Sequence, residues 1–340
     1  MNAPVDALSS LRPASPVEPR QTAELSLEDG RRLAWAEFGE ESGAPVFYFQ
    51  GTSHSRWARP DDCITRSLGA RLIVIDRPGF GCSDYQRGRL LLDWPNDVIA
   101  VASELDIDRF AVVGIAPYVA VCAHQIPGRL TAASIVGGMA PPEIMKKSEG
   151  RIEDRPDGFR LRWAPWSLVP RMEKAFRLAD IANRPGLLLD RDLPKMSESD
   201  RRLLDEPDLR EMFEKSYSEA YRRGARGLVR EMHLYARPWG FRLEKIRFDT
   251  VLWHGEEDYV VPIRAAIEMA ARIPGCRIRS LKSLGHFALF AQWQRILTDL
   301  LLRHDLALGR YDRIVWPVDD VKRSAYAGPQ QTLEPVALVA

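Results

Sequence analysis

The segment Thr250-Val-Leu-Trp-His-Gly-Glu-Glu-Asp258-Tyr-Val-Val-Pro262 decides the fold of this 340-residue chain. Residues 250–254 form a continuous apolar run, which is typical of a strand that is buried on both faces. Asp258 follows this run in a turn, and a helical pattern begins at residue 263. A buried strand, a turn and a helix make the repeating unit of a parallel α/β sheet, whose functional groups gather at the carboxyl ends of the strands.

Similar strand-like runs occur on both sides of this segment. They lie at residues 45–50, 71–76, 110–114, 132–136 and 276–281. Apolar residues recur at helical spacing between them, at residues 91–105, 118–125, 263–273 and 290–306. Near the N-terminus, Asp29-Gly30 separates two further runs and predicts a hairpin. The alternation predicts an α/β fold with a mostly parallel, doubly wound sheet.

One long segment interrupts the alternation. Residues 144–245 are charged, rich in arginine and helical in pattern, and they contain no long β-branched run. We therefore predict a helical cap at 144–245, inserted into a core formed by residues 22–143 and 246–310. Residues 1–21, rich in Ala, Pro and Ser, are predicted to be a flexible tail. Residues 311–340 are predicted to be a C-terminal extension.

The charge balance and the apolar pattern exclude several classes of function. Forty-eight Lys and Arg face 47 Asp and Glu, so the net charge of +1 gives no field that would attract nucleic acid. No apolar stretch is long enough to cross a bilayer, and residues 1–20 lack the pattern of a secretory signal. The four cysteines are far apart in sequence, which fits reduced thiols. We expect a cytoplasmic protein that takes a small molecule and has no nucleic-acid or membrane partner; nothing specifies its oligomeric state.

A histidine follows the strand-like run at 276–281, just as Asp258 follows its own run. It lies in Leu284-Gly285-His286-Phe287. A carboxylate beside an imidazole fixes the tautomer of the ring and stabilises its protonated form, so such a pair can act as a general base. Taken singly, Asp258 is more simply a helix cap and His286 a buried histidine, and the two can pair only if both strand ends meet at the top of the sheet. The resemblance described next places them where a known family has its acid and its base, and so implies a dyad.

These segments, together with Phe49-Gln50-Gly51-Thr52 and the turn at residues 76–84, resemble the α/β-hydrolase superfamily. The resemblance covers residues 23–308 approximately and is strongest to the capped branch of esterases, epoxide hydrolases and peptidases. It implies a sheet with an inserted cap, and the order of acid before histidine matches that family. It also implies that the loop after residue 49 supplies the oxyanion site.

The nucleophile position departs from the family pattern G-x-S-x-G. The matching stretch is Gly114-Ile115-Ala116-Pro117-Tyr118, so Ala116 replaces the serine and Tyr118 the second glycine. An alignment that starts at Pro117 also places no hydroxyl there. Pro117 lacks the N–H that the family uses in its oxyanion hole, a loss of about 10²–10³ in rate. Proline also disfavours helical backbone at Ala116, so we expect Ala116 to be extended.

Other groups are candidate nucleophiles or ligand contacts. Cys122 is expected to pack in the core, and the phenol of Tyr118 has too high a pKa to attack. Ser53, His54 and Ser55, which follow Gly51, are better candidates, but we prefer to interpret them as a polar loop that positions the ligand. The predicted oxyanion-loop and ligand-binding residues are Gln50, Gly51, Thr52, Ser53 and Tyr118. The predicted aromatic contacts from the cap are Trp163, Trp166 and Trp239.

Three functions follow from these residues. The first is an enzyme in which His286, held by Asp258, acts as a base without a covalent intermediate on a small, largely apolar carbonyl compound. The second is an inactive family member that binds a small ligand or a protein. The third is an esterase with a displaced nucleophile such as Ser53. No cofactor or metal is expected, because no G-x-G-x-x-G follows the first strand and no ligand cluster occurs in the sequence.

Overall fold

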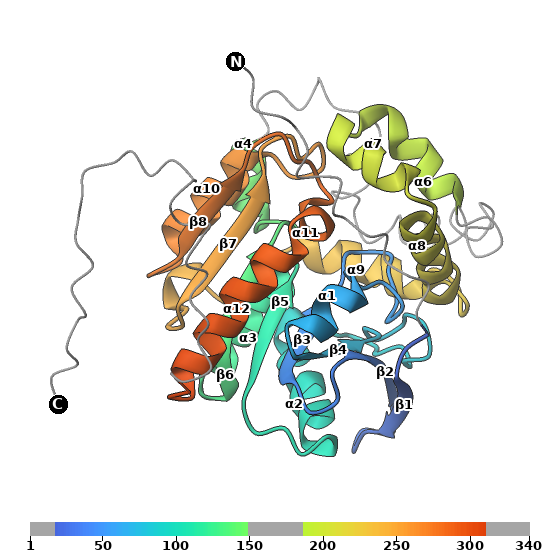
Figure 1. The fold of residues 1–340 in the computed structure, drawn as a ribbon, viewed down its shortest axis with the longest axis vertical. Helices are drawn as coiled ribbons and strands as arrows, with labels where there is room; N and C mark the ends of the chain where they lie inside the picture. The colour runs from blue at the N-terminus through green and yellow to red at the C-terminus, as the bar shows by residue number, and fades with distance from the viewer. Residues whose placement is uncertain (1–17, 149–185, 311–340) are drawn as a thin grey trace, which may run out of the picture.

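An eight-stranded sheet forms the core of the computed structural model, which describes residues 18–148 and 186–310 (Figure 1). The strand order is β1-β2-β4-β3-β5-β6-β7-β8. The strands are β1 Gln21–Ser26, β2 Arg32–Gly39, β3 Ala44–Phe49, β4 Ala70–Ile75, β5 Phe110–Gly114, β6 Leu130–Val136, β7 Thr250–Gly255 and β8 Arg277–Leu281. β2 pairs antiparallel with β1 and β4, and the other pairs are parallel. The predicted mostly parallel α/β sheet is confirmed.

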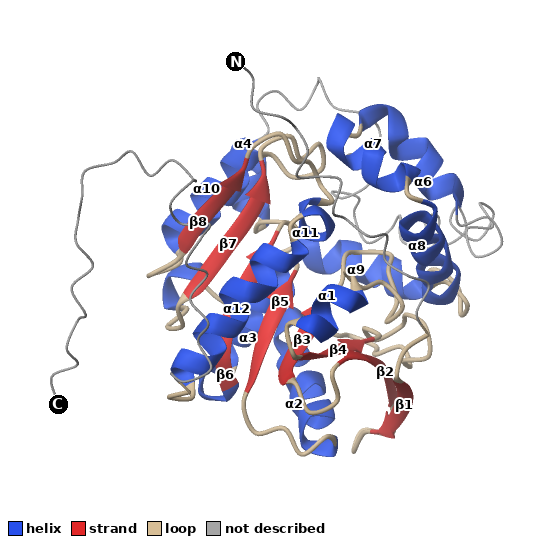
Figure 2. Cartoon of the chain, viewed as in Figure 1, coloured by secondary structure: helices blue, strands red, loops and turns tan. Residues whose placement is uncertain are grey.

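Helices cover both faces of this sheet (Figure 2). α1 and α12 contact one face, whereas α2, α3 and α10 pack on the other. The bounds are α1 Asp62–Ser67, α2 Trp94–Glu104, α3 Ala116–Gln125, α4 Pro142–Ser148, α10 Ile263–Arg272, α11 Ala288–Ala291 and α12 Trp293–Ala307. The doubly wound arrangement is thus confirmed.

Strand β3 shows why the central strands are apolar throughout. Val46 and Tyr48 join the buried cluster that contains Trp293 of α12. The alternate residues, Phe47 and Phe49, join the cluster on the opposite face. Because both faces of the strand are covered, no position on it is left for a polar side chain.

Between β6 and β7, the described residues form α4 and, after residue 185, four further α-helices. These four are α6 Gly186–Asp192, α7 Glu198–Asp205, α8 Pro207–Ala220 and α9 Arg226–Ala236. Helix α8 buries Leu209, Met212, Phe213 and Tyr217, which recur at helical spacing. These residues form one apolar cluster with Phe287 of the core, so the segment packs on the sheet domain.

The N-terminal boundary differs from the prediction. β1 begins at Gln21, inside the range predicted as a tail, because Gln21 pairs with Glu37 in the hairpin and Arg20 forms an ion pair with Glu37 at 2.7 Å. Residues 1–17, 149–185 and 311–340 lie outside the described residues, so the remainder of the tail, much of the predicted cap and the C-terminal extension are not described.

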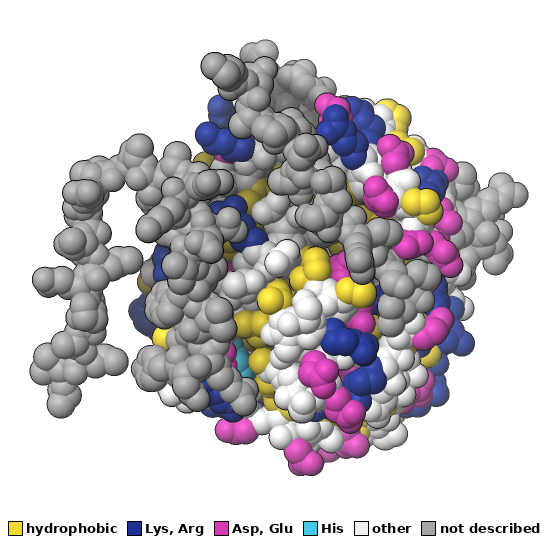
Figure 3. All heavy atoms as spheres, viewed as in Figure 1, with side chains coloured by type: hydrophobic (Ala, Val, Ile, Leu, Met, Phe, Trp, Pro, Cys, Tyr) yellow, Lys and Arg dark blue, Asp and Glu magenta, His cyan; other side chains and the backbone are white. Residues whose placement is uncertain are grey.

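The distribution of surface charge and the length of the helices relate to the partners predicted from the sequence. Where described residues are visible in Figure 3, basic and acidic side chains are interspersed rather than separated by sign. Within residues 18–148 and 186–310, every helix is too short or too polar to cross a bilayer.

Candidate active site

The predicted dyad forms at the carboxyl ends of β7 and β8. Nδ1 of His286 lies 3.0 and 3.1 Å from the two carboxylate oxygens of Asp258. Asp258 Oδ1 also accepts hydrogen bonds from the backbone N–H groups of Val260 and Val261, at 2.8 and 2.9 Å. The side chain of Asp258 is 1% exposed and that of His286 is 31% exposed. The carboxylate is therefore fixed in the protein, whereas the imidazole is accessible.

The environment of Asp258 keeps it ionised. Burial by itself raises the pKa of this carboxyl group. This effect is outweighed by the charge and hydrogen bond of His286, by the charge of the nearby His254 and by the hydrogen bond from the Val261 N–H. The pKa of Asp258 therefore lies below its usual value. Nδ1 of His286 donates to this carboxylate, which fixes Nε2 as the nitrogen that is able to accept a proton.

A second carboxylate, Asp200 of α7, holds the histidine loop from the other side. Its two oxygens accept the backbone N–H groups of His286 and Phe287, at 2.7 and 2.9 Å. A Cβ at Gly285 would lie only 2.1 Å from Asp200 Oδ2, so this approach requires glycine. The sequence analysis missed Asp200; its only signal was an acid within the first turn of a helix, which is common.

A cavity of about 330 Å³ lies between the strand ends and helices α6, α8 and α9. Its walls are mainly Met, Leu, Phe, Tyr and Val side chains, and its polar groups include His54 and His286. Residues from the sheet domain that line it include Thr52, Ser53, Ile115, Met139 and Phe290. Residues from helices α6 to α9 and their connections include Leu189, Met196, Tyr217, Met232 and Tyr235. The volume and lining suit a small, largely apolar ligand.

The loop after β3 is divided between the cavity and the core. Gly51, Thr52 and Ser53 line the cavity, and Ser53 has a left-handed backbone with φ of 74°. Gln50 is fully buried and its Nε2 donates to the carbonyl of Ile75 at 2.9 Å. Gln50 therefore ties the ends of β3 and β4 together, and its prediction as a ligand-binding residue is wrong.

These features match a known family. Residues 43–299 match the alpha/beta hydrolase family, a span of well over half of the chain. The chain belongs to the alpha/beta hydrolase family. The fold of this family member is also that of an esterase from Thermogutta terrifontis, with 19% identity, a TM-score of 0.60 and coverage of 84% of this chain and 99% of that one.

Two other solved structures share the fold. An enol-lactonase from Burkholderia xenovorans has 16% identity and a TM-score of 0.60, with 82% of this chain and all of that chain covered (100%). A hydrolase from Pseudomonas aeruginosa has 18% identity and a TM-score of 0.55, with coverage of 83% and 98%. At these identities the likeness concerns the fold alone. No curated protein sequence matches the chain.

Ala116, the residue predicted to stand at the nucleophile position, faces the core. Ala116 is the first residue of α3, is fully buried, and donates its N–H to the carbonyl of Gly137 at 3.2 Å. Ile115 lines the cavity instead, with extended backbone at φ −68° and ψ 146°. The expectation that Ala116 would be extended is wrong, because the turn from strand to helix is completed one residue earlier. Among the described non-glycine residues, a positive φ occurs only at Ser53, Asp106 and Ser283, so the positive φ at this turn belongs to Gly114, at 142°, and not to Ala116.

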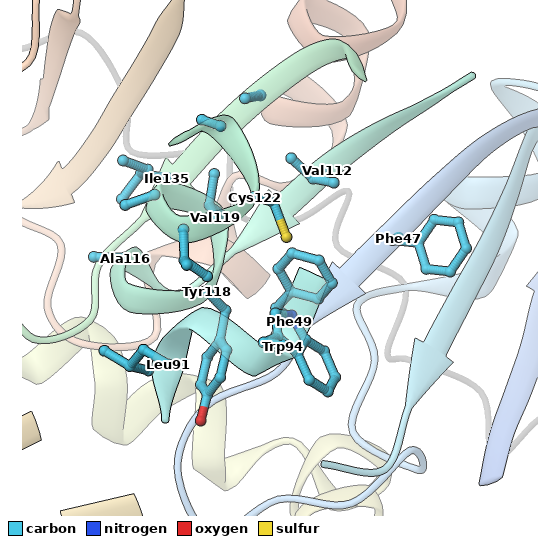
Figure 4. Packing of buried hydrophobic residues seen from close by; sticks show 14 of the residues in the cluster. Phe47, Phe49, Leu91, Trp94, Val112, Ala116, Tyr118, Val119, Cys122 and Ile135 are labelled. Carbon is cyan, nitrogen blue, oxygen red and sulfur yellow. The ribbon is translucent and has the colours of Figure 1, made fainter. Parts of the chain in front are cut away.

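Tyr118 and Cys122 belong to the same buried apolar cluster as Ala116 (Figure 4). The hydroxyl of Tyr118 accepts a hydrogen bond from Arg89 at 2.7 Å, and its ring contacts Trp94 with centroids 5.2 Å apart. Burial raises the pKa of both the phenol and the Cys122 thiol. Neither group lines the large cavity, so the prediction of Tyr118 as a ligand contact is wrong, and Cys122 packs in the core as expected.

One of the predicted aromatic cap contacts, Trp239, lies among the described residues, and it does not line the large cavity. Trp239 lines a separate cavity of about 80 Å³ and packs on Phe241, with ring centroids 5.9 Å apart. Its indole is buried and joins the core cluster on the α2 and α3 side of the sheet, so it does not contact the large cavity. Trp163 and Trp166 lie outside the described residues.

A buried charged network joins α9 to the sheet domain. Nε of Arg77 lies 2.9 Å from Glu231 Oε1, and the hydroxyl of Tyr235 donates to the same oxygen at 2.5 Å. Arg77 also donates to the carbonyls of Gln50 and Gly51, at 2.5 and 2.8 Å. The charge on Glu231 thereby fixes the arginine that orders the loop after β3.

One group of side chains has the spacing of a metal site. Ligand atoms of Asp76, Cys82 and Glu219 lie within 4.8 Å of one another. The guanidinium of Arg56 lies 2.5 Å from Asp76 and 2.8 Å from Glu219, so a cation already neutralises these carboxylates. This group therefore does not fit a metal ion.

Proposed function

We propose that this alpha/beta hydrolase family member is an enzyme in which His286, held by Asp258, acts as a general base without a covalent intermediate. The observation that supports this most strongly is an ordered dyad beside a cavity of about 330 Å³, with a buried alanine at the nucleophile position. The substrate class that we propose is a small, largely apolar carbonyl compound.

The proposed chemistry needs a base and a carbonyl but no nucleophilic side chain. Nε2 of His286 takes a proton either from water, which then attacks the carbonyl, or from the carbon next to the carbonyl. Asp258 stabilises the imidazolium that forms in either case. In hydrolysis the imidazolium returns its proton to the alkoxide that leaves when the tetrahedral intermediate collapses to the acid; in exchange it returns a solvent-derived proton to the enolate carbon. The apolar walls limit water around the reacting groups and strengthen these electrostatic interactions.

Two probes separate the two kinds of base chemistry. Phenyl acetate reports hydrolysis, and 2-indanone in D2O reports exchange of the proton next to a carbonyl. We expect the wild type to accelerate at least one reaction, and His286→Asn and Asp258→Asn to lower its rate by about 10²–10⁴-fold. His124→Asn, which changes a histidine of α3 away from the cavity, is the matched control. Equal rates for wild type and His286→Asn would refute the proposal.

The second candidate function is binding without turnover. The buried Ala116 and the missing N–H of Pro117 favour it, because both parts of the family's acyl-transfer machinery are absent. Equilibrium dialysis with phenyl acetate, followed by chromatography, distinguishes the two candidates. Recovery of intact ester at saturating protein supports binding alone, whereas steady conversion to phenol rejects it.

The third candidate, an esterase that uses Ser53, has weaker support. Ser53 lines the cavity in a strained backbone conformation. However, no hydrogen bond joins its hydroxyl to His286 in the described structure, so no base activates it there. Labelling by a fluorophosphonate that is lost in Ser53→Ala would establish this candidate, and absence of labelling would remove it.

A further inference from the structure

The cavity contains a second imidazole, His54, that the proposed mechanism does not yet use. We propose that His54 is a neutral hydrogen-bond donor that binds the developing oxyanion of the substrate, in place of the N–H that Pro117 lacks. Its role in catalysis rests on the proposed function, but its ability to donate to an anion is testable without any turnover.

The backbone at the start of α3 cannot bind an oxyanion. Pro117 has no N–H, and the N–H of Ala116 is committed to the carbonyl of Gly137 at 3.2 Å. Oxyanion stabilisation needs ordered donors in a site of low dielectric constant. A replacement donor must therefore come from another wall of the cavity, and the loop after β3 is the wall on which this family places its other donor.

His54 is held rigidly in that wall. It lines the cavity and is only 6% exposed. Its ring stacks on Tyr217 of α8, with centroids 4.5 Å apart and planes inclined by 18°, and lies 5.1 Å from the ring of Phe213. A Cβ at Gly51 would lie 3.3 Å from Cδ2 and 4.0 Å from Nε2, so glycine at this position leaves that edge of the ring uncovered.

The contacts of Ser216 restrict His54 to two arrangements. Ser216 Oγ accepts the backbone N–H of Ser55 at 3.0 Å and lies 3.2 Å from Nδ1 of His54 and 3.4 Å from Ser55 Oγ. Either Nδ1 donates to Ser216, or Ser216 donates to Nδ1, the nearer and more basic acceptor, and Ser55 Oγ–H points to Ser216. The proposal takes the second arrangement, and the NMR measurement below distinguishes the two. A neutral imidazole that accepts at Nδ1 carries its proton on Nε2. Nε2 has no hydrogen-bond partner among the described residues.

His54 remains neutral throughout the physiological range. Burial is the main cause that lowers its pKa to about 3, and the charges of Arg77 and His286 add to this effect. A neutral imidazole donates a hydrogen bond without competing with His286 for the role of base. The two histidines thus have different roles: His286 removes a proton, and His54 stabilises the resulting negative charge on oxygen.

Two probes of similar shape measure this donor directly. 4-Nitrophenolate carries an oxyanion, and nitrobenzene has the same ring without it. We expect the wild type to prefer the phenolate, and His54→Phe to lower phenolate affinity by about 10- to 100-fold while nitrobenzene affinity changes little, the effect of one hydrogen bond to a charged group. His54→Gln, which keeps a donor, should retain part of the preference.

The outcomes separate this inference from the proposed function. Loss of phenolate affinity in His54→Phe supports the donor even if His286→Asn leaves all turnover unchanged. An equal loss of both affinities, or no wild-type preference for phenolate, would show that His54 is only a wall of the cavity. As a check on the unliganded protein, ¹⁵N NMR should show the His54 proton on Nε2 at neutral pH; a proton on Nδ1 would overturn the inference.

Discussion

Ala116 shows how the start of a helix decides what a side chain contacts. It is the residue predicted to replace the family's serine, but it begins α3 and its side chain packs in the core. The residue that lines the cavity at this point is Ile115. The path from strand to helix therefore directs Ile115, and not Ala116, to the cavity.

This geometry predicts that restoring the hydroxyl does not restore a nucleophile. Ala116→Ser, and the double variant Ala116→Ser with Pro117→Gly, should show no covalent labelling by a fluorophosphonate in intact-mass spectrometry. The buried hydroxyl should lower the free energy of unfolding by about 1–3 kcal/mol. A serine esterase labelled in parallel is the positive control, and stoichiometric labelling at position 116 would contradict the structure.

Burial of His54 predicts a stability that falls in acid. The unfolded chain binds a proton near the ordinary pKa of 6.5, whereas the folded protein does so only near about 3, so protons favour the unfolded state between these values. His304, whose pKa burial lowers to about 4, acts in the same direction. For each of these groups, the free energy of unfolding should fall by up to about 1.4 kcal/mol per pH unit below about 6.5.

Urea unfolding at a series of pH values checks this dependence. His54→Gln should have a shallower slope than the wild type in this window, since one of the two histidines no longer titrates. Ser103→Ala, an exposed change in α2 that removes no titratable group, is the control and should keep the wild-type slope. Parallel slopes for wild type and His54→Gln would show that His54 is not buried in its neutral form.

At the scale of elements, α7 holds the catalytic loop through one carboxylate. Asp200→Ala should leave the N–H groups of His286 and Phe287 unpaired and lower the free energy of unfolding by about 1–3 kcal/mol for each. Asp200→Asn should lose less stability, because the amide keeps one oxygen that can accept a hydrogen bond from the loop. Asp205→Ala, on the exposed side of the same helix, is the control and should change stability by less than about 0.5 kcal/mol.

The measurement is denaturant unfolding of the three variants together with the exchange rate of the His286 amide proton. Faster exchange in Asp200→Ala than in Asp205→Ala is the expected result. If Asp200→Ala and Asp205→Ala were both as stable as the wild type, Asp200 of α7 would not hold the loop.

Helix α9 is joined to the core by a buried ion pair. Glu231→Gln removes the charge opposite Arg77 and Arg89, and should lower the free energy of unfolding by about 3–5 kcal/mol, because two guanidinium groups remain buried. Glu211→Gln, at an exposed position of α8, is the control. Equal thermal unfolding temperatures for the two variants would contradict the network.

Elements and residues differ in how far the sequence predicted them. The apolar runs predicted the strands well, since burial on both faces leaves a local pattern. The dyad was predictable because Asp258 and His286 each follow a strand. Asp200 was not, since its partners are 86 and 87 residues away. Whether the side chains of Ala116 and Tyr118 face the cavity or the core depends on the residue at which α3 begins. If the helix began one residue earlier or later, different side chains would face the cavity.

At the scale of the whole molecule, the strand order explains why the cavity lies where it does. The chain moves from β3 to β4 on one side and returns to β5 on the other, so the loops that follow β3 and β5 diverge. Ligands in such sheets bind at this point. His54 and Ile115 come from these two loops, and His286 reaches the same cavity after β8, where its ring pairs with the buried Asp258 that follows β7.

The central claim is that His286 does its chemistry without a covalent enzyme intermediate. Its most direct test is intact-mass spectrometry of the wild type and Ser53→Ala, quenched repeatedly during phenyl acetate hydrolysis. We predict that both proteins turn over whichever of the two probes, phenyl acetate or 2-indanone, the wild type accelerates, and that no acetylated protein forms in phenyl acetate at any time. An acetyl adduct that forms and decays at the turnover rate would contradict the claim.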